Sequence, residues 1–170
     1  MDETYCETDA HSLIGDNIPA ENTDAESRVK TVLPTHTFLE KMFLLAEEFQ
    51  KERPRSVRVS RHLYDLEKLM DTQYGHDALA NRTLYDAIVE HRRTYYALKY
   101  VNYALLSPST INFMIPEQHR EEWQADYANM RRFFIYGQSL DFDMLMNRMA
   151  ELQMRVRNMG YVPVAGESAT

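Results

Sequence analysis

Cysteine, glycine and proline are all scarce in this chain of 170 residues, which holds one Cys, five Gly and six Pro. The single cysteine, Cys6, cannot form an intrachain disulfide, which fits a reducing compartment. So few Gly and Pro residues leave few turns and favour long helices over many short strands. No apolar run approaches the roughly 20 residues that cross a bilayer, and the first ten residues do not resemble a secretory signal. We therefore expect a cytoplasmic protein with no membrane partner.

Several catalytic and metal-binding motifs are also missing. The six histidines have no paired helical spacing, and no Walker loop, GxGxxG or GxSxG motif occurs. The segment "GQSLDFD" superficially resembles a magnesium-binding Gly-Ser and DxD pair. Its carboxylates would share a metal only on a strand, whereas on a helix Asp141 and Asp143 diverge by ~200°. We predict that Asp141 caps a helix and that this chain holds no metal.

Charge is distributed unevenly along the chain, whose net charge is −7. Eight of the 26 carboxylates, and none of the 19 Lys and Arg side chains, fall within residues 1–27. The rest of the chain is therefore close to neutral and can still form local basic clusters. We expect residues 1–28 to be disordered or to be the remnant of a larger domain, and residues 159–170 to be a disordered tail.

Hydrophobic spacing predicts an all-α fold, a bundle of about five helices with a short strand-like lead-in at residues 28–34. The first helix follows this strand, with Thr37 and Glu40 at the spacing of a capping box. A loop is expected around residues 74–76. The other helices are expected at residues 60–71, at 81–98, from Pro116 onward, and at 141–158.

The helix at residues 60–71 is amphipathic. At ~100° per residue, Arg61, Asp65 and Lys68 fall on one stripe. The opposite side is apolar and consists of Val59, Leu63, Leu66 and Met70. The stripe is explained either as a solvated face with an Arg61/Asp65 pair or as part of a binding site.

Two further patterns suggest contacts with RNA. In "HRRTYYALKYVNY", Arg92, Arg93 and Lys99 alternate with tyrosines, a mixture able to contact phosphates and stack on bases. Spacing alone equally allows these tyrosines to be buried, and it places Tyr95 and His91 on the core face of the helix together with Leu84 and Ile88. The tyrosines of the segment are Tyr95, Tyr96, Tyr100 and Tyr103.

The second pattern is the spacing of Arg55 and His62, which loosely resembles the R-x(4–6)-H motif of HEPN ribonucleases. In those enzymes an arginine and a histidine would stabilise and protonate phosphate oxygens. Arg55 follows Pro54 in an expected linker. A ribonuclease is therefore a lesser alternative.

Two longer segments, "VLPTHTFLEKMFLLAEEF" and "RVSRHLYDLEKLMD", resemble the region beyond the catalytic core in nucleotidyltransferases of the AbiEii/AbiGii toxin family. This family supplies toxins of type IV toxin–antitoxin and phage-defence systems. The resemblance extends over residues 29–158, where "LYDAIVEHRR", "EEWQADYANM" and "FFIYGQSLDFDML" also fit its helical C-terminal half. The matching motif residues are Pro34, Thr37, Glu40 and Lys41 in the first segment, and Arg61, His62, Asp65 and Leu66 in the second.

The resemblance implies a role for several of these residues. Lys41 would engage the triphosphate and Asp65 would lie beside the active-site cleft, so both are expected to be catalytic. Nucleotide binding would involve Lys41 with Arg61, His62 and Lys68. Asp65 is expected to orient Lys41 or Arg61 by a charge-assisted hydrogen bond. The chain departs from the family at His36 and Ala46, where arginine and histidine are usual.

The Gly-Ser…DxD segment, which precedes these motifs in the family and holds two magnesium ions, has no counterpart here. The resemblance therefore implies the helical C-terminal portion of an enzyme that transfers a nucleotide from an NTP to RNA, with a tRNA end as the expected acceptor. The complete enzyme would need magnesium and NTP, and this chain alone is expected to be inactive. Its expected partners are the missing N-terminal half, a cognate antitoxin and tRNA. The alternative is a helical module that docks RNA or protein.

Overall fold

The computed structural model describes residues 5–10 and 27–159, and the side chains from residue 30 onward. This part of the chain contains six α-helices and one antiparallel pair of strands, so the all-α fold class is confirmed. The elements are β1 (Tyr5–Ala10), β2 (Ser27–Val32), α1 (Pro34–Glu48), α2 (Arg61–Leu69), α3 (Gln73–Ala80), α4 (Arg82–His91), α5 (Arg120–Phe133) and α6 (Phe142–Arg157).

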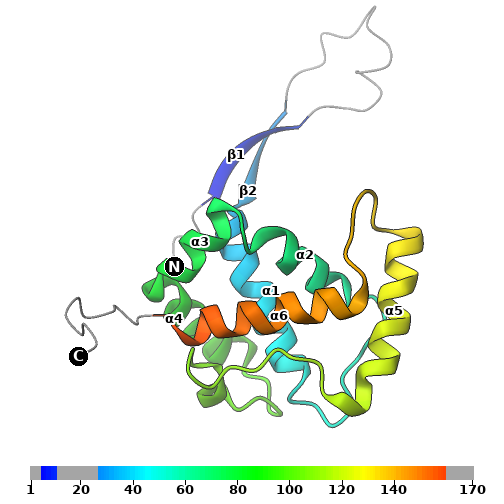
Figure 1. Ribbon diagram of the computed structural model, residues 1–170. Helices are drawn as coiled ribbons and strands as arrows, with labels where there is room; N and C mark the ends of the chain where they lie inside the picture. The colour runs from blue at the N-terminus through cyan, green and yellow to red at the C-terminus, as the bar shows by residue number, and fades with distance from the viewer. Residues whose placement is uncertain (1–4, 11–26, 160–170) are drawn as a thin grey trace, which may run out of the picture.

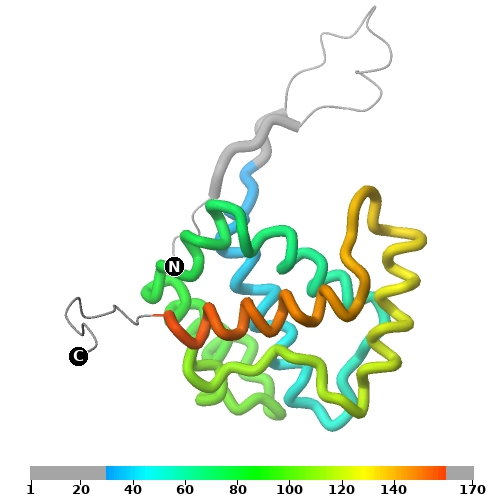
Figure 2. The backbone as a smooth tube through the Cα atoms, viewed as in Figure 1, coloured from blue at the N-terminus to red at the C-terminus, as the bar shows by residue number. Residues whose placement is uncertain are grey.

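Helix α1 lies in the middle of the bundle and contacts α2, α3 and α4, while α6 packs against α2 (Figure 1). The connection from α1 to α2 runs alongside α5, as the backbone trace shows (Figure 2). The lead-in strand expected at residues 28–34 is β2. It pairs with β1, which the sequence analysis did not anticipate, from Tyr5 opposite Val32 to Ala10 opposite Ser27. The strand pair projects away from the helices (Figure 1).

The core is formed mainly by the apolar stripes that the sequence predicts. Phe38, Met42 and Leu45 of α1 are fully buried, and so are Leu63 and Leu66 of α2. The same holds for the largest aromatic side chains of α5, Trp123 and Tyr127. Among the described residues, no helix is both long and apolar enough to cross a membrane.

Helix α3 replaces the loop expected around residues 74–76, and this prediction was wrong. Thr72 caps the helix, since its hydroxyl accepts a hydrogen bond from the Gly75 backbone N–H at 3.4 Å. Gly75 is needed for close packing rather than for a turn, because a Cβ there would lie 2.4 Å from the Leu69 carbonyl oxygen. Gly75 therefore permits the close approach of α3 to the end of α2.

The predicted helix caps have different outcomes. The capping box of Thr37 and Glu40 is absent, because α1 already begins at Pro34, a residue suited to the first helical turn. Asp141 caps α6 as predicted, and its carboxylate accepts a hydrogen bond from the Met144 N–H at 2.8 Å. The expected C-cap at Gly160 and the tail lie outside the described residues.

The helix expected at residues 81–98 ends earlier, at His91. A π turn, Arg92–Tyr96, follows it and ends at Ala97, whose φ of 45° is left-handed. Each hydrogen bond of a π turn spans five residues, so the turn is wider and shifts the side chains off the α-helical stripe. Ile88 is buried as predicted, but Tyr95 is 74% exposed and its predicted burial was wrong.

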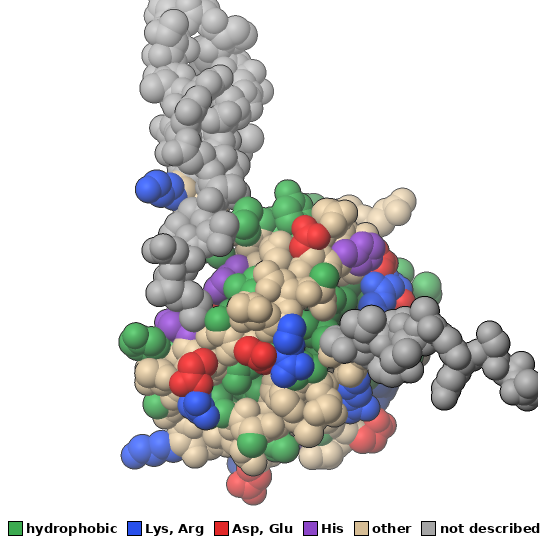
Figure 3. All heavy atoms as spheres, turned by 90° about the vertical axis from the view of Figure 1, so that its left-hand side faces the viewer, with side chains coloured by type: hydrophobic (Ala, Val, Ile, Leu, Met, Phe, Trp, Pro, Cys, Tyr) green, Lys and Arg blue, Asp and Glu red, His purple; other side chains and the backbone are tan. Residues whose placement is uncertain are grey.

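Acidic and basic side chains alternate on the side of the molecule where α3 and α4 lie (Figure 3). Arg82 and Asp86 form an exposed pair there at 2.9 Å, one turn apart on α4. Arg93 likewise pairs with Glu90. The positive charges of these two arginines are therefore largely balanced by neighbouring carboxylates.

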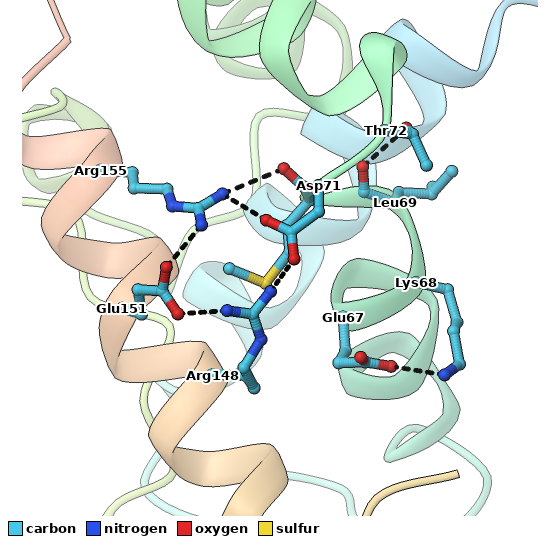
Figure 4. Close-up of polar contacts among 9 residues, drawn as sticks. Glu67, Lys68, Leu69, Asp71, Thr72, Arg148, Glu151 and Arg155 are labelled. Atoms are coloured by element: carbon cyan, nitrogen blue, oxygen red, sulfur yellow. Dashed lines mark hydrogen bonds and ion pairs between the residues drawn. The ribbon is translucent and has the colours of Figure 1, made fainter. Parts of the chain in front are cut away.

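Charged residues of other segments fix both ends of α2. Just before the helix, Asp126 of α5 accepts hydrogen bonds from the backbone N–H groups of Arg58, at 2.8 Å, and Ser60, at 3.3 Å. The Ser60 hydroxyl also donates to this carboxylate. Just after the helix, Asp71 lies between two arginines of α6 (Figure 4). The residues of this second cluster are Asp71, Arg148, Glu151 and Arg155.

Candidate functional site

An ion pair joins the two helices that carry the motif residues. The Lys41 Nζ of α1 lies 2.6 Å from the Asp65 Oδ2 of α2, and both side chains are partly exposed. Asp65 therefore contacts Lys41, one of the two cationic side chains that it was expected to orient. An ammonium group carries three donors, so this bond leaves Lys41 two N–H groups for a ligand.

His62 lies beside this pair and is half-buried. Its Nδ1 is 3.9 Å from the Asp65 Oδ2, and no described residue forms a hydrogen bond with it. Burial, followed by the positive charges of Lys41 and Arg61, lowers the pKa of His62 from 6.5 to about 4. The imidazole is therefore neutral at pH 7 and adds no charge to the site.

Each partner of the ion pair lines a different cavity. Lys41 contributes to the larger one, of about 720 Å³, and Asp65 to a smaller one of about 320 Å³. His36 lies on the wall of the larger cavity. The remaining walls of this cavity come from β2, α1, α4 and the π turn, and they include Glu40, His91, Tyr95 and Tyr96.

The other predicted nucleotide-binding residues, Arg61 and Lys68, lie near the start and the end of α2. Arg61 is exposed and lines the smaller cavity with Asp65. Lys68 lies 3.1 Å from Glu67 and lines a third cavity of about 430 Å³, next to Arg131. The structure therefore brings Lys41, His62 and Asp65 together, with Arg61 close to them, and places Lys68 over a separate hollow.

Arg92, predicted to bind RNA, is buried instead of exposed. Its guanidinium donates to both carboxylate oxygens of Glu47, at 2.8 and 2.6 Å, and also to Glu40. Burial alone would lower the pKa of Arg92, but the hydrogen bonds to Glu47 and the charge of Glu40 raise it. The guanidinium is thus held by carboxylates and does not face solvent.

This network contains a residue that sequence reasoning missed, Glu47. Its side chain is 4% exposed although it is charged, and it joins α1 to the π turn through Arg92. The spacing of Glu40 and Glu47, seven residues apart, places both on one face of α1 and was an available signal. Their common partner, Arg92, lies 52 residues after Glu40 and 45 residues after Glu47, so the spacing within α1 could not identify it.

The other predicted RNA contacts are at the surface. Arg93 is exposed and paired with Glu90, and Lys99 is exposed. Tyr96 and Tyr100 are 50% and 44% exposed. The rings of His91 and Tyr95 lie 4.6 Å apart on the wall of the larger cavity.

The described residues do not fit a metal centre. Nowhere in residues 30–159 do three or more His, Cys, Asp or Glu side chains gather closely enough to hold an ion. Asp143, the second carboxylate of the apparent DxD pair, forms an ion pair with Arg120 at 2.6 Å. Among the described residues, Lys41 is able to bind an anion and the aromatic wall is able to stack on a ring.

Comparison with known proteins gives one match. The family model described as nucleotidyl transferase AbiEii toxin, type IV TA system, matches residues 8–148. No curated protein and no solved structure matches the chain.

Proposed function

The chain belongs to the AbiEii nucleotidyl transferase toxin family, and on this premise we propose that it is the helical part of an enzyme that transfers a nucleotide from an NTP to RNA. A tRNA end is the proposed acceptor, and a cognate antitoxin opposes the reaction in the cytoplasm. In the complete enzyme, two magnesium ions would be held by a Gly-Ser…DxD segment, which this sequence does not contain. Without that segment the chain is inactive.

The observation that carries this proposal is the Lys41–Asp65 ion pair at the edge of the larger cavity. Nucleotidyl transfer depends mainly on positioning the phosphates and neutralising their charge. Asp65 holds the Lys41 ammonium group in place, and the free N–H groups of Lys41 bind phosphate oxygens.

The dimensions and lining of the larger cavity suit a nucleotide. Its volume of about 720 Å³ lies within the usual range of small-molecule sites, about 300 to 1,000 Å³. His91, Tyr95 and Tyr96 supply aromatic rings on the wall formed by α4 and the π turn. These rings stack on the base while Lys41 binds the phosphates.

Binding of a fluorescent ATP analogue to the purified chain tests this role of Lys41. Lys41→Ala removes a charge-assisted hydrogen bond, so we expect about 10- to 100-fold weaker binding. Lys41→Arg should retain part of the affinity. The matched control is Arg82→Ala, which removes one positive charge from an exposed ion pair on α4. Equal affinities of Lys41→Ala and the unmodified chain would refute the nucleotide site.

Incorporation of labelled nucleotide into tRNA tests the proposed inactivity. With magnesium and any of the four NTPs, the purified chain should produce no labelled RNA, because its sequence lacks the Gly-Ser…DxD segment. Steady incorporation that Lys41→Ala abolishes would show that the chain is a complete enzyme. The nucleotide site would then stand and the inactivity would be wrong.

The ribonuclease alternative is disfavoured by the state of His62. A histidine with a pKa of about 4 is almost entirely unprotonated at pH 7 and cannot act there as an efficient proton donor. RNA cleavage by the purified chain that disappears in His62→Ala would restore this alternative.

A further inference from the structure

The arginines of this chain differ in whether a carboxylate balances them. Six of those with described side chains form ion pairs with described acidic residues: Arg82, Arg92, Arg93, Arg120, Arg148 and Arg155. The other arginines with described side chains form no such ion pair, and one of them, Arg157, is the last residue of α6. The remaining six also form no ion pair with a described carboxylate. They are Arg53, Arg55, Arg58, Arg61, Arg131 and Arg132.

The unpaired arginines near the start of α2 lie beside the unpaired arginines at the end of α5. The Arg58 backbone is hydrogen bonded to Asp126 of α5, and its guanidinium lies 5.3 Å from the centre of the Phe134 ring. Arg58 and Arg61 line the smaller cavity together with Phe134. The neighbouring hollow is bordered by Arg131, whose Nε donates to the Ser139 hydroxyl at 3.0 Å.

We propose that this surface, the arginine strip of Arg58, Arg61, Arg131 and Arg132, binds single-stranded RNA. All four arginines are exposed. Guanidinium groups suit phosphates because they present several donors in one plane. The inference rests on the proposed function in one respect, namely that the acceptor of the nucleotide is an RNA.

Exposed aromatic rings distinguish the arginine strip from a merely basic surface. Phe133 and Phe134 are 54% and 55% exposed, and Tyr136 is 90% exposed. The guanidinium of Arg132 lies 5.0 Å from the centre of the Phe133 ring. Tyr136 has no hydrogen bond or ring contact with any residue that the structure describes. Cations next to exposed aromatic rings are typical of surfaces that follow a single strand and stack on its bases.

The backbone at Arg58 is held in a conformation that few residues adopt. Its φ is 61°, in the left-handed region, although Arg58 is not a glycine. Asp126 stabilises this turn by accepting the N–H groups of both Arg58 and Ser60. The guanidinium of Arg58 is therefore placed over Phe134 before any ligand arrives, and such locally strained residues often lie at functional sites.

The arginine strip also leads to the nucleotide site. Arg61 and Asp65 line the same cavity, and Asp65 contacts Lys41. An RNA strand bound along the strip would therefore end near the Lys41–Asp65 pair, where the proposed reaction needs its acceptor. The RNA-binding surface predicted from the sequence, around residues 92–99, offers fewer unpaired positive charges, because Arg92 is buried and Arg93 is paired with Glu90.

Fluorescence anisotropy with a labelled oligoadenylate of about 12 nucleotides tests the arginine strip, in the absence of NTP and magnesium. Arg131→Ala/Arg132→Ala should weaken binding about tenfold, and it should make the slope of log affinity against log salt less steep by about 1.4. The control, Arg82→Ala/Arg157→Ala, removes two exposed charges from other surfaces and should leave binding unchanged. Tyr136→Ala keeps every charge and should weaken binding about tenfold through lost stacking.

Three outcomes would overturn the inference. These are the absence of binding, an equal loss of affinity in both double variants, and competition by polyglutamate as strong as that by RNA while Tyr136→Ala has no effect. The last result would identify a surface for an acidic protein. The oligonucleotide is tested without NTP, whereas the nucleotide site is tested with an ATP analogue and no RNA, so a failure of the arginine strip is distinguishable from a failure of the nucleotide site.

Discussion

Removing the buried arginine of the π turn should destabilise the whole fold. In Arg92→Ala, both oxygens of Glu47 lose their hydrogen bonds while the carboxylate stays buried, since the side chain is 4% exposed. Glu40 also loses its partner, but it is 26% exposed and can be hydrated. The main cost is therefore the uncompensated charge of Glu47.

The size of this effect follows from the burial of the pair. Removing one partner of a buried ion pair costs about 3 to 5 kcal/mol, a large part of the roughly 5 to 15 kcal/mol that stabilises a domain. Replacing both partners by apolar residues removes the unpaired charge, so Arg92→Met/Glu47→Leu should recover most of the loss. Glu40→Ala should cost about 1 kcal/mol or less, as is usual for partly exposed pairs.

Urea unfolding can measure these differences through the fluorescence of Trp123, the single tryptophan, which is fully buried in α5. Far-ultraviolet circular dichroism should report the same midpoint if unfolding is two-state. A free energy of unfolding of Arg92→Ala that lies less than about 1 kcal/mol below that of the unmodified chain would refute this explanation. The Arg92–Glu47 contact would then not form in solution as described.

Two further predictions concern pH and packing. Because folding lowers the pKa of His62 from 6.5 to about 4, the unfolded chain binds a proton more readily between these values, so stability is retained above pH 6.5 and lost as the pH falls towards 4. Between pH 7 and 5 we expect the free energy of unfolding to fall by roughly 1 to 2 kcal/mol, after allowance for the partial exposure of His62. A His62→Gln variant whose free energy of unfolding falls by the same amount would contradict this explanation. Gly75→Ala should destabilise the protein by about 1 to 3 kcal/mol, because its Cβ would lie 2.4 Å from the Leu69 carbonyl oxygen. Helix propensity alone predicts the opposite sign, so a raised melting temperature would show that the backbone adjusts.

Local patterns predicted most of the helical fold because hydrophobic periodicity reports directly which side of a helix is buried. The apolar stripe of α2 is an example, since Leu63, Leu66 and the neighbouring Met70 are all fully buried. The Lys41–Asp65 contact was also anticipated, although only the resemblance to a known family connected the two motifs. Spacing within one helix gives no information on which helix lies opposite.

The errors came from features that periodicity cannot represent. The π turn interrupts the 3.6-residue repeat, so Tyr95 is exposed although it continues the spacing of Ile88. Arg92 was assigned to the surface because charged residues are usually exposed, and its buried partner Glu47 is 45 residues away. The positions of the arginine strip depend on how α5 packs beside the α1–α2 connection, which is a property of the tertiary fold.

The fixed ends of α2 have a consequence for how this protein can change during evolution. Asp126 holds the backbone before the helix, and Asp71 connects its other end to α6. Neither contact uses the exposed side chains of α2, so these can be exchanged without moving the helix. New combinations of residues on this surface can therefore arise in an unchanged framework, which would let related proteins acquire different ligands through a few substitutions.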